Sequence, residues 1–223
     1  MKPKILLSWS SGKDSAWALH VLRERNEVEI AGLLTTINTH FERVAMHGTR
    51  QVLLRMQARA AGLPLWEVPL PWPCANEVYE HAMSAACVSA IQQGISAIAF
   101  GDLFLEDVRR YREDRLRDTG LQPMFPLWGR NTQQLVEEML DGGLRARIVC
   151  VDVSKMPGDF AGRDLDRDLL RRLPAGVDPC GENGEFHTFA YAGPMYSEPI
   201  SIKDGECVTR DRFLYADVLP TTG

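Results

Sequence analysis

Short runs of apolar residues alternate with stretches of helical periodicity through the first two thirds of the chain. Four runs have the length and composition of buried strands, at residues 5–7, 28–34, 65–70 and 95–100. Three intervening stretches place apolar residues on one face of a helix, at residues 14–25, 49–61 and 76–93. Strands that alternate with helices are typical of a parallel sheet with crossover connections. Asn76, shortly after a Pro-Trp-Pro break, is expected to cap the third helix.

The pattern changes near Asn131. From here it predicts a helix, a strand, a second helix and a set of antiparallel strands, over residues 132–140, 146–151, 164–173 and 186–218. We therefore expect two parts. Residues 1–130 form an α/β domain, with an open, mostly parallel sheet and helices on both faces. Residues 131–223 form a smaller C-terminal α+β module.

Composition narrows the class of protein. The 223 residues are 45% hydrophobic and 25% charged, which is enough apolar material for a sizeable core. The net charge of -5 disfavours a protein that mainly grips nucleic acid. The five cysteines contain no C-x-x-C pair, so neither a disulfide framework nor a structural zinc site is expected. No apolar run approaches a membrane span, and the amino-terminal run is too short for a signal peptide, so we expect a cytoplasmic protein.

The strongest chemical signal is the polar loop between the first strand and the first helix. It reads Ser8-Trp9-Ser10-Ser11-Gly12-Lys13-Asp14-Ser15. Open α/β sheets bind ligands at the carboxyl ends of their strands, and small residues there let backbone N–H groups surround an anion. The helix N-terminus adds partial positive charge and Lys13 adds a full one, so the loop predicts a phosphate site. It is not a Walker A loop, because Leu7 and Asp14 stand where Gly and Ser or Thr are required.

Two further positions lie at the same predicted sheet edge. Gly101 and Asp102 directly follow the fourth strand, where the carboxylate can hold Mg²⁺ or orient an acceptor; the alternative is a strand-ending turn. Thr35 and Thr36 end the second predicted strand, where backbone groups can pair with an adenine edge; the alternative is that they are ordinary strand residues.

The start of the second predicted helix carries another candidate. Arg50 can reach a phosphate, whereas the neighbouring His47 is expected to be an ordinary surface or core imidazole. The charged run at residues 109–118 is expected to form a solvated helix, with an arginine that reaches polyphosphate or a carrier protein as the alternative.

A second cluster lies near the C-terminus. The segment Cys180-Gly181-Glu182-Asn183-Gly184-Glu185-Phe186-His187 places two carboxylates and an imidazole among flexible residues. Two acids suit a cationic or amine-bearing substrate, and Glu or His can serve as a base toward ammonia or an amine. The alternative is a glycine-bearing turn with solvated acids.

Four stretches resemble a known family. Residues 10–15 are similar to the S-G-G-x-D-S loop of the PP-loop ATP pyrophosphatases, which belong to the adenine nucleotide alpha hydrolase-like (HUP) group, with Ser11 in place of the first glycine. Residues 100–103, 126–128 and 180–189 are similar to the diphthine-ammonia ligase family within that superfamily. The chain departs from the family in the middle of residues 103–112, and in Asn183 and His187, where the family tends to have Gly and Glu.

The resemblance implies an ATP-dependent ligase. Such enzymes cleave ATP between the α and β phosphates, so that a substrate carboxylate is adenylated, pyrophosphate leaves, and ammonia or an amine displaces AMP. The implied partners are ATP, a carboxylate-bearing acceptor, ammonia or an amine, and a second copy of the chain, with no membrane and no nucleic acid.

The resemblance also implies roles for the residues. The catalytic set would be Lys13, Asp14, Asp102, Glu182 and Glu185. ATP would contact Ser8, Ser10, Ser11, Gly12, Lys13, Asp14, Ser15, Thr35, Thr36, Arg50 and Gly101. The acceptor would contact Glu182, Asn183, Gly184, Glu185 and His187. Mg²⁺ would bind Asp14 and Asp102.

Two other functions stay open from the sequence. A nucleotide sensor would hold ATP or AMP without turnover, although the Lys-Asp-Ser end of the loop and the glutamate-rich motif argue against it. An RNA-modifying PP-loop enzyme is disfavoured by the acidic balance and by the missing cysteine pair.

Overall fold

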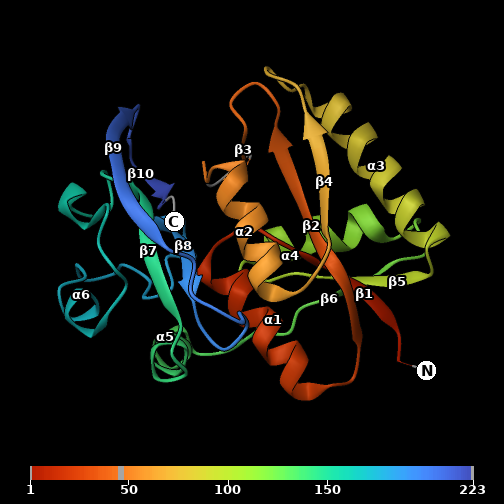
Figure 1. Cartoon of the computed structure of the whole chain (residues 1–223), viewed down its shortest axis with the longest axis horizontal. Coiled ribbons are helices and arrows are strands. Elements are labelled where there is room, and N and C mark those ends of the chain that lie inside the picture. Colours follow the sequence, from red (N-terminus) through yellow and green to blue (C-terminus); the bar gives the residue numbers. More distant parts are fainter. Residues whose placement is uncertain (1, 45–47, 222–223) are drawn as a thin grey trace.

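The computed structural model describes residues 2–44 and 48–221, and Figure 1 shows its arrangement. The amino-terminal part contains, in order, β1 (Lys4–Ser8), α1 (Lys13–Arg25), β2 (Glu29–Asn38), β3 (Arg43–Val44), α2 (Gln51–Ala61), β4 (Leu65–Leu70), α3 (Asn76–Gln92), β5 (Ile95–Ala99), α4 (Glu106–Leu116) and β6 (Gln122–Met124). The C-terminal part contains α5 (Thr132–Asp141), β7 (Arg145–Asp152), a 3-10 turn at Gly158–Phe160, α6 (Arg167–Arg171), β8 (Phe186–Ala192), β9 (Ile202–Arg210) and β10 (Phe213–Pro220).

The larger sheet is centred on β1. This strand pairs in parallel with β2 on one side and β5 on the other, β2 pairs in parallel with β4, and β5 pairs in parallel with β6. The short β3 is antiparallel to β2. The chain builds one half of the sheet as β1, β2 and β4, and then crosses back to build the other half from β5. The carboxyl ends of β1 and β5 therefore flank the point where the strand order reverses, which is where open α/β sheets bind ligands.

Alternating side chains of the strands make two apolar layers. Ile5 and Leu7 of β1 belong to the core that includes α1 and α2, whereas Leu6 between them belongs to the core that includes α3 and α4. All three side chains are fully buried. Successive side chains of a strand point to opposite faces, so a sheet that is apolar on both faces needs helices on both. The predicted fold class is confirmed.

The smaller sheet is antiparallel, with strand order β8-β7-β10-β9. Its apolar side chains join the same core as α1 and α2, which lie between the two sheets in Figure 1. Phe189 of β8 and Val151 of β7, for example, belong to one cluster with Leu19 of α1 and Leu54 of α2. The C-terminal α+β part is thus observed. The division of the chain at residue 130 stays a prediction.

The structure corrects several predicted boundaries. The second strand does not end at Thr35 and Thr36, because β2 continues to Asn38 along β4. The helix predicted over 164–173 shortens to Arg167–Arg171, because Leu165 donates its backbone N–H to Ala146 at the margin of the smaller sheet.

Three other elements also differ from the sequence-based prediction. Asn76 is the first helical residue of α3 and does not cap it, since Ala75 occupies the cap position. The strands β3 and β6 are too short to give an apolar run, and neither was predicted. The charged run does form a solvated helix, α4, in which Arg109 and Glu113 make an ion pair of 2.7 Å one turn apart.

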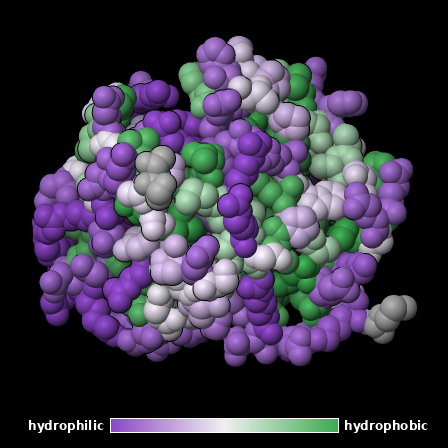
Figure 2. Space-filling view, in the orientation of Figure 1, coloured by the Kyte–Doolittle hydropathy of each residue, from purple (hydrophilic) through white to green (hydrophobic). Residues whose placement is uncertain are grey.

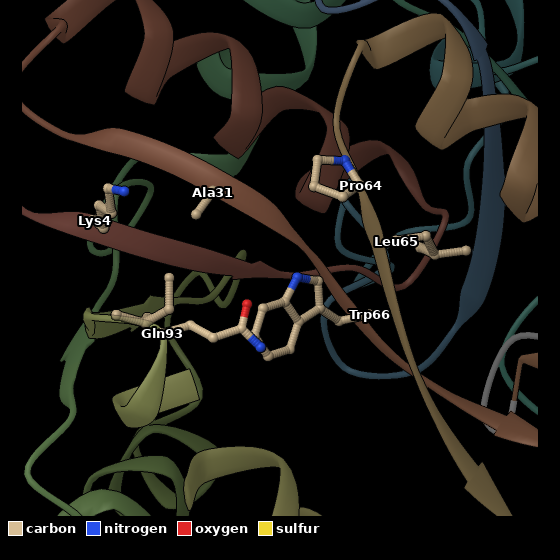
Figure 3. Close-up of a pocket in the computed structure, with 7 residues that line it drawn as sticks. Lys4, Ala31, Pro64, Leu65, Trp66 and Gln93 are labelled. Carbon is tan, nitrogen blue, oxygen red and sulfur yellow. The ribbon is translucent and has the colours of Figure 1, made fainter. Parts of the chain in front are cut away.

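A shallow hollow of about 430 Å³ lies at the amino ends of the parallel strands (Figure 3). Lys4, Leu65 and Ile95 are the first residues of β1, β4 and β5, and all three line it. The hollow is therefore at the opposite end of the sheet from the polar loop that follows β1.

None of the helices in the described ranges is both long enough and apolar enough to cross a membrane.

Candidate active site

The polar loop after β1 turns back on itself and leads directly into α1. Ser11 adopts the left-handed backbone conformation (φ 71°), which favours glycine, and its hydroxyl hydrogen-bonds the Thr49 hydroxyl at 2.8 Å. Ser15 donates from its hydroxyl to the Gly12 carbonyl at 3.0 Å. The loop is therefore held in shape by its own side chains and by Thr49, two residues before α2, with the positive end of the α1 dipole at its mouth.

Gly101 allows the carboxyl end of β5 to approach this loop closely. A Cβ atom at this position would lie 3.0 Å from the Asp14 carbonyl carbon and 3.0 Å from the Ser15 nitrogen. Any side chain would press on the first turn of α1. The glycine thus places the next residue, Asp102, beside the loop.

Asp102 is held by a long ionic contact. Its Oδ2 lies 3.6 Å from Nε of Arg112, too far for a hydrogen bond, and both atoms are buried. Burial raises the pKa of Asp102, the Arg112 charge lowers it, and the nearby Asp14 raises it. The side chain of Asp102 therefore lies close to that of Asp14 in a weakly hydrated place.

The glutamate-rich segment folds over the same sheet edge. Glu182 accepts a hydrogen bond from the backbone N–H of Leu103 at 2.8 Å, next to Asp102, although 79 residues separate the partners. Burial raises the pKa of Glu182 to about 7, with Asp14 and Asp102 adding to the effect. Three predicted site residues, Asp14, Asp102 and Glu182, are thus brought together with Lys13.

Lys13 joins the two parts of the chain. Its backbone N–H donates to the Thr188 hydroxyl at 3.0 Å, and its Nζ donates to the Cys180 carbonyl and, at 2.8 Å, to Asp14. The side chain is 2% exposed. Burial lowers the pKa of Lys13, but the nearby negative charge, led by Asp14, leaves it raised. Burial raises the pKa of Asp14, against the effect of Lys13.

The Cys180 thiol is not activated by this environment. Burial raises its pKa to about 12, and the thiol donates to the Thr132 carbonyl at 3.4 Å. A nucleophilic cysteine needs a lowered pKa. The buried Cys180 thiol is therefore not poised as a nucleophile.

Three residues that sequence reasoning missed hold the site together. Gln57 is fully buried; it accepts from the Trp9 indole at 2.8 Å and donates to the Ser11 and Ala190 carbonyls at 2.9 and 2.7 Å. Thr188 receives the Lys13 N–H, and Asp178 accepts the backbone N–H of Glu182 at 2.9 Å. Thr188 lies in the family-like stretch 180–189 but was given no role, Asp178 belongs to no motif, and Gln57 gave a signal as a polar residue on the apolar face of a predicted helix.

The other residues predicted to contact the acceptor substrate differ in their surroundings. Glu185 is 3% exposed, and its Oε1 accepts from Asn183 at 3.2 Å and from the backbone N–H of Asp178 at 3.1 Å. Burial, followed by the Lys13 charge, lowers the pKa of His187 to about 4, so the imidazole is neutral at pH 7. In contrast, Asn183 itself is exposed, beside Gly184. Its backbone carbonyl accepts a hydrogen bond from the Lys155 ammonium at 2.6 Å.

Arg50 lies apart from the loop, as part of a different cluster. Its guanidinium donates to both Asp217 oxygens, the shortest contact being 2.6 Å. Asp217 also pairs with Arg43 at 2.9 Å. The phosphate contact of Arg50 stays a prediction, and His47 lies outside the described residues. Of the two threonines in β2, Thr35 is 4% exposed and Thr36 half-buried.

Several of the predicted site residues have a buried oxygen atom without a hydrogen-bond partner among the described residues. These atoms are Asp14 Oδ1, Thr35 Oγ1, Asp102 Oδ2 and Glu185 Oε2. A buried acceptor without a partner costs about 1–3 kcal/mol, so proteins rarely leave one unpaired. A polar ligand that reached these oxygens would satisfy them.

Comparison with known sequences now identifies the class of protein. The profile of the diphthamide synthase N-terminal domain matches residues 1–123, more than half of the chain, and that of the diphthamide synthase C-terminal domain matches residues 131–217. The chain belongs to the diphthamide synthase family.

Three relatives carry the name diphthine–ammonia ligase. The Bos taurus protein is 27% identical over 181 residues, covering 73% of this chain and 67% of the relative. The Homo sapiens protein is 30% identical over 153 residues, covering 65% and 56%, and the Danio rerio protein is 33% identical over 120 residues, covering 51% and 47%. The chain thus spans about half to two thirds of the length of these curated relatives.

Proposed function

We propose that the protein is an ATP-dependent carbon–nitrogen ligase that joins a carboxylate to ammonia or an amine, as the name of its relatives suggests. ATP would lie across the carboxyl ends of β1 and β5, with its β and γ phosphates in the loop of residues 10–15. The acceptor, of the diphthine type, would lie against residues 182–187. In this proposal residues 1–130 bind ATP and residues 131–223 supply the acceptor side.

One observation carries the proposal. The Glu182 carboxylate reaches Leu103 at the end of β5, while Lys13 reaches Cys180, so an anion-binding loop and an acidic motif share one buried place. A site that only sensed a nucleotide would not need the acidic motif. A ligase needs both, because it must hold two substrates in a reactive orientation.

The proposed reaction has two steps, adenylation of the carboxylate and displacement of AMP by the nitrogen. In the first, an oxygen of the acceptor carboxylate forms a bond to the α-phosphorus of ATP, the bond from that phosphorus to the bridging oxygen breaks, and pyrophosphate leaves. Lys13 and the α1 N-terminus stabilise the charge that develops on the leaving group. In the second step, the nitrogen attacks the acyl carbon and AMP leaves. Glu182, ionised above a pKa of about 7, takes the proton that the nitrogen loses.

Mg²⁺ fits the donor set that the chain presents. Asp14 and Asp102 each have a buried carboxylate oxygen with no hydrogen-bond partner in the described ranges, and hard oxygen donors are what Mg²⁺ prefers. No group of three His, Cys, Asp or Glu suited to a metal occurs among the described residues. That is consistent with an ion held by one or two carboxylates together with substrate phosphates. When bound, Mg²⁺ neutralises phosphate charge.

Product analysis tests the proposal. The protein is incubated with ATP, Mg²⁺, ammonium and a panel of carboxylates that includes diphthine, and AMP with pyrophosphate is separated from ADP with phosphate. We expect AMP and pyrophosphate that depend on the acceptor. ADP would contradict the proposal, and so would the absence of any turnover with every acceptor.

Two lysine substitutions, at opposite ends of β1 and its loop, give a test variant and its matched control. Lys13→Ala should lower the rate about 10²-fold or more, because it removes a charge from the leaving-group site. Lys4→Ala changes an exposed lysine at the amino end of the sheet and should leave the rate unchanged.

A further inference from the structure

Arg112 of α4 is a half-buried arginine that makes no hydrogen bond to any of the described residues. Its Nε is buried and lies 3.6 Å from Asp102 Oδ2, beyond hydrogen-bond length. Two other arginines of the same helix, Arg109 and Arg115, donate to nearby glutamates. Hydrophilic residues cover much of the face shown in Figure 2, and water satisfies charged groups at such a surface. The buried Nε of Arg112 lies away from that water.

The ring of Phe100 fixes the position of this guanidinium. The Arg112 Cζ atom lies 5.0 Å from the centroid of the ring, directly after β5. Phe100 is buried, so its ring covers one face of the guanidinium with an apolar surface. Gly101 and Asp102 follow Phe100 in the chain, so Arg112 lies at the edge of the sheet that carries the candidate site.

The contact with Asp102 uses one side of the guanidinium only. It is made by Nε, so the two terminal nitrogens of Arg112 keep their N–H groups for another partner. Terminal nitrogens of an arginine form a planar fork that matches the two oxygens of a carboxylate or a phosphate. An anion placed there would also satisfy donors that the described residues leave unused.

The charge of the surroundings indicates which anion needs this arginine. The carboxylates of Asp14 and Asp102 lie close enough to Glu182 to act on its charge. Lys13 cannot balance a further anion, because its ammonium already donates to Asp14 and to a backbone carbonyl and is almost fully buried. In the proposed function, ATP with Mg²⁺ adds net negative charge to the same place. An acceptor carboxylate would be repelled there unless a free cation faced it.

We propose that Arg112 binds the carboxylate of the acceptor through its two terminal nitrogens, and thereby selects an acid over a neutral acceptor. This inference rests on the proposed function, since it identifies the residue that receives the acceptor of that reaction. The phosphates of ATP have cationic partners of their own in Lys13 and the N-terminus of α1. One hydrogen bond to each carboxylate oxygen leaves a lone pair on each, so the bound acid can still attack the α-phosphorus. The amide product carries no charge for Arg112 to hold.

Comparing an acid with its amide tests the proposal on the full chain. The probe is diphthine, or the other carboxylate of the panel that gives AMP fastest, with its primary amide as a competitive inhibitor. Arg112→Gln should raise the KM for the acid about tenfold or more, because it removes a charge-assisted pair. The Ki of the amide should change by a much smaller factor, because hydrogen bonds to neutral groups are weaker. The KM for ATP should stay unchanged.

Two further variants separate charge, shape and general effects on the helix. Arg112→Lys keeps the charge and loses the planar fork, so its KM for the acid should lie between those of the unmodified protein and Arg112→Gln. Arg115→Gln is the matched control, on the same helix and paired with Glu80 at the surface, and it should leave all three constants unchanged. Circular dichroism establishes that each variant is folded.

Three outcomes would contradict the proposal, and each has a different meaning. Equal changes in the KM of the acid and the Ki of the amide would show that Arg112 only supports the fold around Asp102. A higher KM for ATP with an unchanged KM for the acid would assign the guanidinium to phosphate. If the unmodified protein forms no AMP with any carboxylate, the proposed function itself fails, and this inference fails with it.

Discussion

Glu182 shows how a single residue acquires a property that its sequence neighbours do not explain. The acids near it along the chain are Asp178 and Glu185, but the charges that act on it belong to Asp14, Lys13 and Asp102. Burial is the largest cause of its raised pKa. The motif could be recognised from the sequence, but the environment of this carboxylate could not, because it depends on contacts more than 75 residues away.

The raised pKa predicts a pH dependence of folding stability. The pKa of Glu182 is about 7 in the folded protein, against 4.5 for an ordinary glutamate, so between these values the folded state holds a proton that the unfolded state has lost. The free energy of unfolding therefore falls as the pH rises from about 4.5 to 7, by roughly 1–3 kcal/mol from this residue.

Urea unfolding at pH 5 and pH 8 measures this effect. Glu182→Gln keeps the acceptor for Leu103 and removes the titration, so its stability should change less between the two values than that of the unmodified protein. Glu198→Gln, at an exposed position, serves as the control and should behave like the unmodified protein. Equal pH dependence in all three would show that Glu182 does not titrate in this range.

Among the elements of the fold, the contacts between β8 and the polar loop that follows β1 position the candidate site. Ser11 and Lys13 bond residues 190 and 188 of β8, and Gln57 of α2 bonds both sides of that junction. The loop itself could be predicted from local pattern, because a strand, a run of small residues and a helix are contiguous. The partner strand could not, since an isolated Thr or Gln carries no sign of the segment 130 or more residues away that it will meet.

The first test of the junction between the loop and β8 replaces Gln57, whose amide bonds both sides of it. Gln57→Leu leaves the Trp9 indole N–H and two carbonyls without this partner, so the free energy of unfolding should fall by about 3 kcal/mol. Affinity for ATP should fall too, because Ser11 loses a bond that orients the loop. Gln51→Leu, on the same helix but bonded to the half-buried Glu67, should change stability by less than about 1 kcal/mol and leave ATP affinity unchanged.

A second test concerns the approach of β5 to α1. Gly101→Ala places a methyl group 3.0 Å from the backbone of Asp14 and Ser15, which should destabilise the protein by about 1–3 kcal/mol and weaken ATP binding. Gly120→Ala meets no atom within 4 Å, although its backbone is left-handed, so it should cost stability without changing ATP affinity. Calorimetric titration with ATP separates the two, and equal affinities would show that the close approach does not matter.

In the molecule as a whole, one hydrophobic core contains side chains from both parts of the chain that the sequence pattern distinguishes. The sequence suggested two domains because the pattern of strands and helices changes near Asn131. In the structure, side chains of α1, α2, β7 and β8 lie in one apolar cluster. Such sharing cannot be recognised from periodicity, because periodicity shows which face of an element is apolar but not which other element covers it.

The shared core predicts a single unfolding transition. Urea denaturation followed by tryptophan fluorescence and by far-ultraviolet circular dichroism should give coincident curves, because neither part can lose its packing without exposing the other. Trp9 and Trp17 lie in the shared core and report on it. Two separated transitions would show that the parts fold independently.

The hydrogen bond from the Lys13 backbone N–H to the Thr188 hydroxyl also bears on when the site forms during synthesis. Synthesis runs from the amino terminus, so Lys13 leaves the ribosome long before the residue that receives its N–H, 175 positions later. The loop that follows β1 is among the first segments to be translated and among the last to gain its partners. A nascent or truncated chain that lacks β8 therefore has the loop sequence without these contacts, and the proposed nucleotide binding is expected only when nearly the whole chain is present.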